Sequence, residues 1–399
     1  MEKKIKNYLF IYLIILFAFS IFFLNIKHNV LNDSTISEWL INYYGGFTKR
    51  GIVGEITIFF ANVLNINLRD SILIFQILII GLYYFLVYYF LKDITFDRIL
   101  LLSIFTPIFL LYPVAEIEVL ARKEIFLFVI WLLYLIIPIN SKKIQDTFKI
   151  IFFPLSILIW EPIVFLFLIW IALDIIHNKI ESFNLLFFKK LMLYLPTVLI
   201  AFYIATNPMS VDQHYKMETY LNTQFNETCY MSCRRLITNS SIISNFQHNI
   251  PRYSFEVFLR YFLIISIGFG PLFIMLFNSS FTNKKLFIFK NFKNLFFPFL
   301  IILSPNIILF AMGGDWGRWV NILYVFSILT FLSLYKNKLI EIDKEKIKNN
   351  FINKLKTKTF VFLFILFCFG WNPKTIITGD VASFPGYRVP YKVFKIFSN

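Results

Sequence analysis

The chain alternates long apolar runs with short polar segments, most of them rich in lysine. A bilayer hydrocarbon core is about 30 Å thick, which an α-helix of about 20 apolar residues crosses. Runs that approach this length therefore predict membrane-spanning helices. They cover residues 8–26, 71–91, 99–115, 124–139, 191–205, 261–277, 295–312, 319–335 and 359–371.

A tenth apolar region, residues 149–176, is divided by Glu161 and Pro162. One kinked helix would hold the carboxylate at the membrane centre, which is costly. Two short helices that turn at Glu161 would keep it at a polar surface or cavity. We adopt this hairpin, which brings the expectation to about eleven transmembrane helices. The sequence thus predicts an all-α, polytopic membrane protein in which residues 1–399 form a single transmembrane domain.

Composition and charge agree with this class. The chain has 399 residues, and 58% of them are hydrophobic, which is too apolar for a soluble globule. A net charge of +16 would suggest nucleic acid in a soluble protein. Here the lysines lie between apolar spans, where they orient helices in a lipid bilayer. We expect no nucleic-acid partner, an uncleaved first helix, a cytoplasmic N-terminus and a C-terminus on the outer, periplasmic side.

Arginine and lysine are distributed unequally between the two predicted sides. Of the 23 basic residues inside, 22 are lysine, whereas nine of the ten arginines lie outside. A guanidinium pairs bidentately with phosphate or carboxylate, while an ammonium is a mobile point charge. This distribution predicts an anionic ligand on the outer face. The alternative is that several of these arginines snorkel to the membrane surface or pair with acidic residues. The outer arginines are Arg50, Arg69, Arg122, Arg234, Arg235, Arg252, Arg260, Arg318 and Arg388.

The first outer segment, residues 27–70, holds a polar island from Tyr43 to Glu55 with four glycines. Glycine lets the backbone approach another chain or a ligand closely. We interpret Lys49 and Arg50 as substrate-binding residues and Glu55 as a catalytic acid or base. The alternative is a re-entrant turn with snorkelling cations, followed by an amphipathic helix at the membrane interface.

Two further sites are expected at outer turns. One holds five charged residues in nine positions, Glu116, Glu118, Arg122, Lys123 and Glu124. On a helix Glu118 and Arg122 would be i,i+4 partners, and both are candidates for substrate binding. Structural salt bridging is the alternative there. Glu161, at the hairpin, is also a candidate for substrate binding, or else a simple helix cap.

The fourth candidate site is the turn Gly313–Trp319, with the sequence Gly-Gly-Asp-Trp-Gly-Arg-Trp. Asp315 and Arg318 are predicted catalytic residues, and Trp316 could stack on a sugar or anchor at the headgroups. An interfacial aromatic belt explains the tryptophans but not the Gly-Gly-Asp-x-Gly-Arg core.

The largest outer loop, residues 206–260, contains Cys229 and Cys233, which could form a disulfide or remain thiols. No Cys and His spacing typical of a metal site is found, and no P-loop or dinucleotide fingerprint is present. We therefore expect no metal and no cofactor, and we exclude ATP-driven transport.

The Gly-Gly-Phe-Thr-Lys-Arg-Gly island (45–51) and Gly-Asp-Trp-Gly-Arg-Trp (314–319) resemble motifs of bacterial surface-polysaccharide membrane proteins. These are similar to O-antigen or capsule repeat-unit polymerases of the Wzy type. The resemblance implies an inner-membrane enzyme that polymerises undecaprenyl-pyrophosphate-linked oligosaccharides at the periplasmic face, with a flippase and a chain-length regulator as partners. The second large Arg-rich loop of the best-known polymerases has no match here.

The plan also resembles GT-C glycosyltransferases more weakly. These have a long first outer loop with an acidic residue near its start and use polyprenyl-phosphate sugars. Asp33, Glu38 or Glu55 would then be the acid or base, but the adjacent acidic pair is absent. A non-catalytic lipid or glycan transporter is a third possibility. In the glycosyl-transfer hypothesis, Arg50, Arg122 and Arg318 bind the pyrophosphate, while Asp315 or Glu55 takes the acceptor proton.

Overall fold

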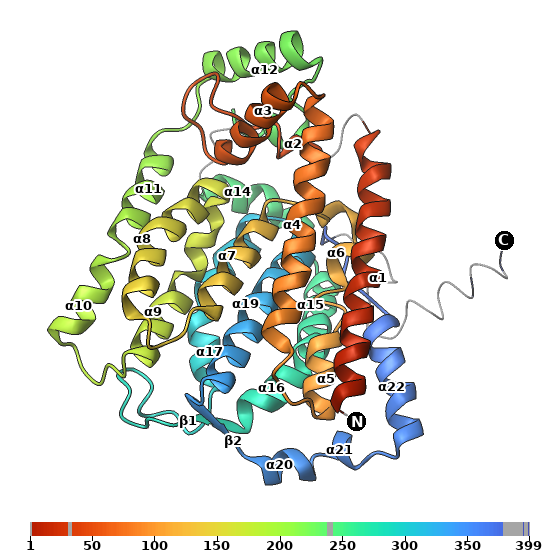
Figure 1. The fold of residues 1–399 in the computed structure, drawn as a ribbon, viewed down its shortest axis with the longest axis vertical. Coiled ribbons are helices and arrows are strands. Elements are labelled where there is room, and N and C mark those ends of the chain that lie inside the picture. Colours follow the sequence, from red (N-terminus) through yellow and green to blue (C-terminus); the bar gives the residue numbers. More distant parts are fainter. Residues whose placement is uncertain (1, 31–33, 238–241, 378–393, 395–397, 399) are drawn as a thin grey trace.

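The computed structural model describes residues 2–30, 34–237, 242–377, 394 and 398, and it confirms an all-α chain (Figure 1). The first helices are α1 (Glu2–His28), α2 (Ser34–Ser37), α3 (Gly51–Leu64), α4 (Leu68–Leu91), α5 (Arg98–Phe105), α6 (Tyr112–Ala115), η1 (Ile117–Val119) and α7 (Glu124–Ile136). The next are α8 (Lys142–Ile159), η2 (Glu161–Leu166), α9 (Phe167–His177), α10 (Leu185–Met192), α11 (Leu195–Thr206), α12 (Val211–Phe225), α13 (Met231–Arg234) and α14 (Ile242–Asn249).

The remaining elements include one short antiparallel pair of strands, in which Ser279 lies opposite Ile342. They are η3 (Ile250–Arg252), α15 (Phe255–Gly268), α16 (Gly270–Phe277), β1 (Ser279–Phe281), α17 (Phe296–Leu303), η4 (Ser304–Asn306), α18 (Ile307–Met312) and α19 (Trp316–Lys336). The chain continues through β2 (Ile340–Ile342), α20 (Lys344–Asn349), α21 (Phe351–Lys354) and α22 (Thr357–Phe369).

The expected number of membrane spans is wrong. In the described residues, three helices are long and apolar enough to cross a bilayer: Ile5–His28 of α1, α4 and α19. Two bent pairs, α10 with α11 (46°) and α15 with α16 (56°), bring the number to five if each pair is one span. The other apolar runs are cut short by polar residues and proline. For example, η4 breaks the expected span 295–312 at Ser304-Pro305, because proline lacks the amide that an α-helix needs.

Segments that the sequence assigns to the inside meet at one end of the molecule. Residues Ser279–Phe281 pair with Ile340–Ile342, Lys336 pairs with Asp93 at 3.5 Å, and the Arg98 guanidinium donates to the Leu355 carbonyl at 2.5 Å. Figure 1 shows β1, β2, α20 and α21 together at this end, which we call the lysine-rich end.

Segments that the sequence assigns to the outside meet at the opposite end, where α2, α3 and α12 lie (Figure 1). Lys27 pairs with Glu118 at 2.9 Å, and the amide of Gly317 donates to the carbonyl of Thr375 at 3.2 Å. We call this the arginine-rich end. The orientation of the two ends across a membrane stays a prediction.

The glycines of the first outer segment are part of the scaffold. A β-carbon on Gly45 would lie 1.9 Å from the carbonyl oxygen of Gln213 in α12. A β-carbon on Gly54 would lie 2.0 Å from the carbonyl oxygen of Ile41. These glycines let the loop dock on α12 and let α3 dock on its own preceding chain, because a side chain has no room at either contact.

Candidate functional site

A network of buried or half-buried charges lies at the arginine-rich end. It joins side chains from the first outer segment, the 116–124 turn, the hairpin at Glu161 and the start of α19. We call it the outer charge network, and its members are Glu38, Lys49, Arg50, Arg122, Lys123, Glu124, Glu161, Asp315 and Arg318.

Arg50 and Glu161 form one part of this network. Arg50 precedes α3 in a left-handed conformation with φ 65°. Its Nε and Nη2 donate to the two Glu161 carboxylate oxygens at 2.7 and 2.8 Å, and Lys49 Nζ lies 3.4 Å from Glu161 Oε1. Burial raises the pKa of Glu161, but Arg50 and Lys49 outweigh it and hold that pKa at about 2. At the helix break, the Glu161 carboxylate therefore pairs with two cations, Arg50 and Lys49. A hairpin that turns at Glu161 requires such polar surroundings for the carboxylate.

Glu38 is the shared anion of the network. It follows α2 directly and is completely buried. Arg122 pairs with its Oε1, and Arg318 Nη2 lies 3.6 Å from the same oxygen. Burial raises the pKa of Glu38, but Arg122 and Arg318 outweigh burial and hold it far below the ordinary value. Its second oxygen, Oε2, is buried without a hydrogen-bond partner in the part of the chain that the structure describes.

Arg318 lies on the first turn of α19 and faces three acids. It pairs with Glu124, with Glu38 and, at 3.3 Å, with Asp315. The rings of Trp160 and Trp319 lie 5.8 and 5.2 Å from its guanidinium carbon, within cation–π range. One cation therefore links the hairpin, the 116–124 turn and the Gly313–Trp319 motif.

Lys123 is completely buried, and its ammonium donates to the carbonyl of Arg50. This bond supports the left-handed backbone of Arg50, a conformation that is uncommon outside glycine. Burial lowers the pKa of Lys123 to about 7, although Glu38 favours the charged form. Lys123 is therefore a positioning residue that holds Arg50 in place.

The Lys123 pKa predicts a pH effect on stability. Between pH 7 and 10.5 the unfolded chain binds a proton at Lys123 and the folded chain does not. The free energy of unfolding therefore rises with pH in this window. Relative to Lys123→Met, we expect the wild type to gain on the order of 2 kcal/mol between pH 7 and 9. Chemical denaturation of both proteins in mild detergent checks this, and parallel pH profiles would contradict it.

The space inside the network is small. A cavity of about 20 Å³ borders Arg122, Glu124 and Arg318, which is room for about one water molecule. A ligand larger than a water molecule can therefore occupy this cavity only if the side chains around it move apart.

The structure brings six of the nine predicted site residues into this network: Lys49, Arg50, Arg122, Glu161, Asp315 and Arg318. It places the other three elsewhere.

Glu55 is exposed and accepts a hydrogen bond from the Tyr43 amide at 3.1 Å. It makes no ion pair in the described part of the chain, and its carboxylate stabilises the loop turn. Trp316 is buried, donates to the Phe310 carbonyl at 2.7 Å and packs against Tyr261. A buried indole with these partners anchors α19 and offers no face to a sugar.

Glu118 does not pair with Arg122. The helix expected through residues 118–122 is absent, because Ala121 is left-handed with φ 53° and η1 ends at Val119. Glu118 pairs with Lys27 and accepts from the Ser34 hydroxyl at 3.3 Å.

Sequence reasoning names Glu38 only as one of three acids under the GT-C hypothesis, and the fold alone brings it to Arg122 and Arg318. It places Lys123 and Glu124 in the charge cluster at residues 116–124, and Trp160 and Trp319 beside Glu161 and Arg318, without giving these four residues a role.

Some outer arginines stabilise the fold outside this network. Arg69 pairs with Glu227 and donates to the His28 carbonyl at 2.9 Å, and Arg260 pairs with Glu256 at 2.7 Å. The unequal distribution of arginine thus reflects structural ion pairs as well as the network. Arg388 and the GT-C candidate Asp33 lie outside the described residues.

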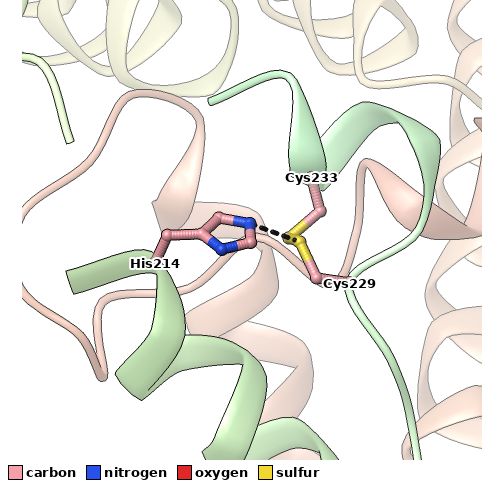
Figure 2. A group of neighbouring side chains, drawn as sticks. All are labelled: His214, Cys229 and Cys233. Atoms are coloured by element: carbon pink, nitrogen blue, oxygen red, sulfur yellow. Dashed lines mark hydrogen bonds between the residues drawn. A yellow bond between two sulfur atoms is a disulfide. The ribbon is translucent and has the colours of Figure 1, made fainter. Parts of the chain in front are cut away.

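Cys229 and Cys233 form a disulfide with a Cα–Cα distance of 5.2 Å. Figure 2 shows the ring of His214 directed at this bond, with Nε2 2.9 Å from the Cys229 sulfur. The ligand atoms of the three residues lie within 4.8 Å of one another, a grouping that sequence spacing did not reveal. Because metals bind thiolates rather than disulfide sulfurs, the oxidised pair is a structural link. It closes a loop whose Ser232 amide donates to Ser37 at 3.2 Å, next to Glu38.

No protein-family description, curated protein or solved structure matches this chain.

Proposed function

We propose that this chain is a membrane glycosyltransferase that acts on a saccharide carried by a polyprenyl phosphate or pyrophosphate. The observation that supports the proposal most is the convergence of Arg50, Arg122 and Arg318, from three separate segments, on one buried network of acids. Long apolar helices such as α1 and α4 are compatible with a lipid-borne substrate. The arginine-rich end would face the outer, periplasmic side of a bacterial inner membrane.

In this mechanism, phosphate oxygens replace carboxylate oxygens as the partners of the guanidiniums. Phosphate and carboxylate present similar oxygen pairs to the planar fork. The acceptor hydroxyl loses its proton and its oxygen bonds to the anomeric carbon, while the bond from that carbon to the phosphate oxygen breaks. Charge develops on the departing phosphate, and Arg318 and Arg122 stabilise it. Arg50 would then bind the same phosphate from the side of α3.

Asp315 is the best candidate for the general base. Burial raises its pKa above the ordinary range, against the pull of Arg122 and Arg235, and its side chain is 30% exposed, so an acceptor hydroxyl can reach it. A base works best when its pKa is near the operating pH. Glu38 is a weaker base, because its pKa is far below the ordinary value. Glu55 lies outside the network, where it accepts a hydrogen bond from the Tyr43 amide.

Exchanging Asp315 for Asn tests this assignment. We expect Asp315→Asn to reduce transfer of saccharide from lipid carrier to acceptor by about a hundredfold, with an unchanged unfolding midpoint. Glu55→Gln is the matched control, because it also removes a carboxylate at the arginine-rich end. Its activity should stay within about twofold of the wild type, since substitutions of exposed residues have small effects. The readout is lipid-linked product from membranes of the native host. Equal activities of the two variants would refute the role of Asp315.

The polymerase and GT-C hypotheses differ in product. Glu38 lies in the first outer loop between Arg122 and Arg318, the loop in which the GT-C alternative, with a monophosphate carrier, expects an acidic residue. A deletion strain that keeps single complete repeat units but loses longer ones indicates a repeat-unit polymerase, for which a flippase and a chain-length regulator are the expected partners. Loss of the complete unit indicates transfer of a single sugar. An unchanged glycan profile on deletion would refute both.

A further inference from the structure

A candidate second site lies at the lysine-rich end, at the opposite ends of α7 and α19 from the outer charge network. A cavity of about 590 Å³ opens where α7, α9 and α19 end and α8 begins. Ligand pockets commonly have volumes of about 300–1,000 Å³. The lining residues are Pro138, Ile139, Asn140, Lys142, His177, Asn178, Lys179, Asn337 and Leu339.

The lining of this cavity carries positive charge. Lys142 and Lys179 are both exposed, and none of the described residues that line the cavity is acidic. The charged side chains of α8, α9 and α10 near the cavity neutralise one another, because Lys149 pairs with Asp174 and Lys190 pairs with Asp146. The two lining lysines therefore set the local charge.

His177 borders this cavity as a buried polar group without a partner. The residue is 8% exposed, and its Nδ1 and Nε2 are both shielded from solvent and lack a hydrogen-bond partner among the described residues. A buried polar atom without a partner costs about 1–3 kcal/mol. Burial, with Lys149 nearby, lowers the pKa of His177 to about 4. The ring is neutral at pH 7 and offers one donor and one acceptor.

Three helices end at this cavity, and the carbonyl groups of a helix C-terminus favour cations. Two of these ends are closed internally. Lys179 and Lys338 are left-handed (φ 51° and 55°), and the amides of Ile180 and Leu339 bond back to the carbonyls of Ile175 and Leu334 at 2.9 Å. Because these carbonyl groups are already hydrogen-bonded, the positive charges of Lys142 and Lys179 affect a bound ligand more strongly than the helix ends do.

We propose that this cavity binds a phosphate-bearing ligand, with Lys142 and Lys179 pairing with the phosphate. The asparagines 140, 178 and 337 add amide groups that suit hydroxyls or ester oxygens. The phosphate could belong to an anionic lipid headgroup or to a free soluble phosphate. The inference does not depend on the proposed glycosyl transfer.

Binding measurements on the purified full-length chain in neutral detergent separate the two sources. Inorganic phosphate is titrated by calorimetry, and retention of phosphatidylglycerol against phosphatidylcholine is followed by native mass spectrometry. Binding of inorganic phosphate indicates a soluble ligand. Selective retention of phosphatidylglycerol without phosphate binding indicates a lipid headgroup. Binding of neither probe overturns the proposal.

A matched pair of double variants tests the location. Lys142→Gln/Lys179→Gln should weaken binding of the active probe at least about tenfold, since each lost charge-assisted bond contributes strongly. Lys348→Gln/Lys354→Gln removes the same charge from exposed lysines at the same end and should change affinity less than about twofold. Equal losses in the two double variants would show nonspecific charge attraction and overturn the site.

Discussion

Replacing Arg318 with lysine is expected to reduce glycosyl transfer by about a hundredfold to a thousandfold. Arg318 faces Glu38, Glu124 and Asp315 at once. A lysine keeps the charge, but its single ammonium cannot present a planar fork to a phosphate while it holds Asp315. The measurement is the initial rate of lipid-linked product formation, together with the thermal unfolding midpoint of each purified protein.

Arg98→Lys is the matched control for this experiment. Arg98 is the one arginine among the basic residues assigned to the inside, and its guanidinium donates to backbone carbonyls at the lysine-rich end. We expect this variant to lose some stability and keep its activity. If Arg318→Lys retained full activity, the guanidinium geometry would have no role in transfer. If both variants lost activity in proportion to stability, Arg318 would be purely structural.

The largest expected effect on stability comes from breaking the Glu38–Arg122 pair. Both side chains are nearly inaccessible, with 1% and 10% exposure. Removing one partner leaves an uncompensated buried charge, which typically costs about 3–5 kcal/mol. We expect this loss for Glu38→Leu and for Arg122→Met. The double variant should be less destabilised than the sum of the two, because two apolar side chains leave neither charge unpaired.

A double-mutant cycle on unfolding free energies in detergent measures this coupling. The cycle includes Arg318, since its Nη2 lies 3.6 Å from Glu38, and Arg318 partly compensates Glu38 when Arg122 is absent. Arg122→Met should therefore destabilise the protein less than Glu38→Leu does. Strictly additive losses would show that the two side chains do not interact in solution.

The sequence was informative where one residue type carried a strong physical constraint. Glu161 before proline predicted a helix break at a polar location, and the structure pairs it with Arg50. The lysine and arginine segments also meet at opposite ends, as their charge types suggested. Helix lengths were predicted poorly, because apolar runs such as 295–312 contain Ser-Pro breaks that a count of apolar residues overlooks.

The sequence could not show which acid each guanidinium meets. Arg122 was matched to Glu118 by spacing, yet the left-handed Ala121 turns the chain, and Arg122 reaches Glu38, 84 positions away. The sequence predicts Trp316 as the substrate-binding tryptophan because it flanks Asp315. In the structure, the rings of Trp160 and Trp319 are the ones that lie near Arg318. Such pairings depend on how helices that are distant in the sequence pack together, which a single sequence does not reveal.

The small volume of the cavity beside the outer charge network determines how a structure of the ligand-bound protein can be obtained. With room for about one water molecule beside Arg122, Glu124 and Arg318, soaking a carrier lipid into preformed crystals would fail. The lipid should instead be present from solubilisation onward, and the inactive Asp315→Asn protein is the form in which to trap it. A cryo-EM reconstruction of that sample would reveal how far the hairpin at Glu161 swings from Arg50.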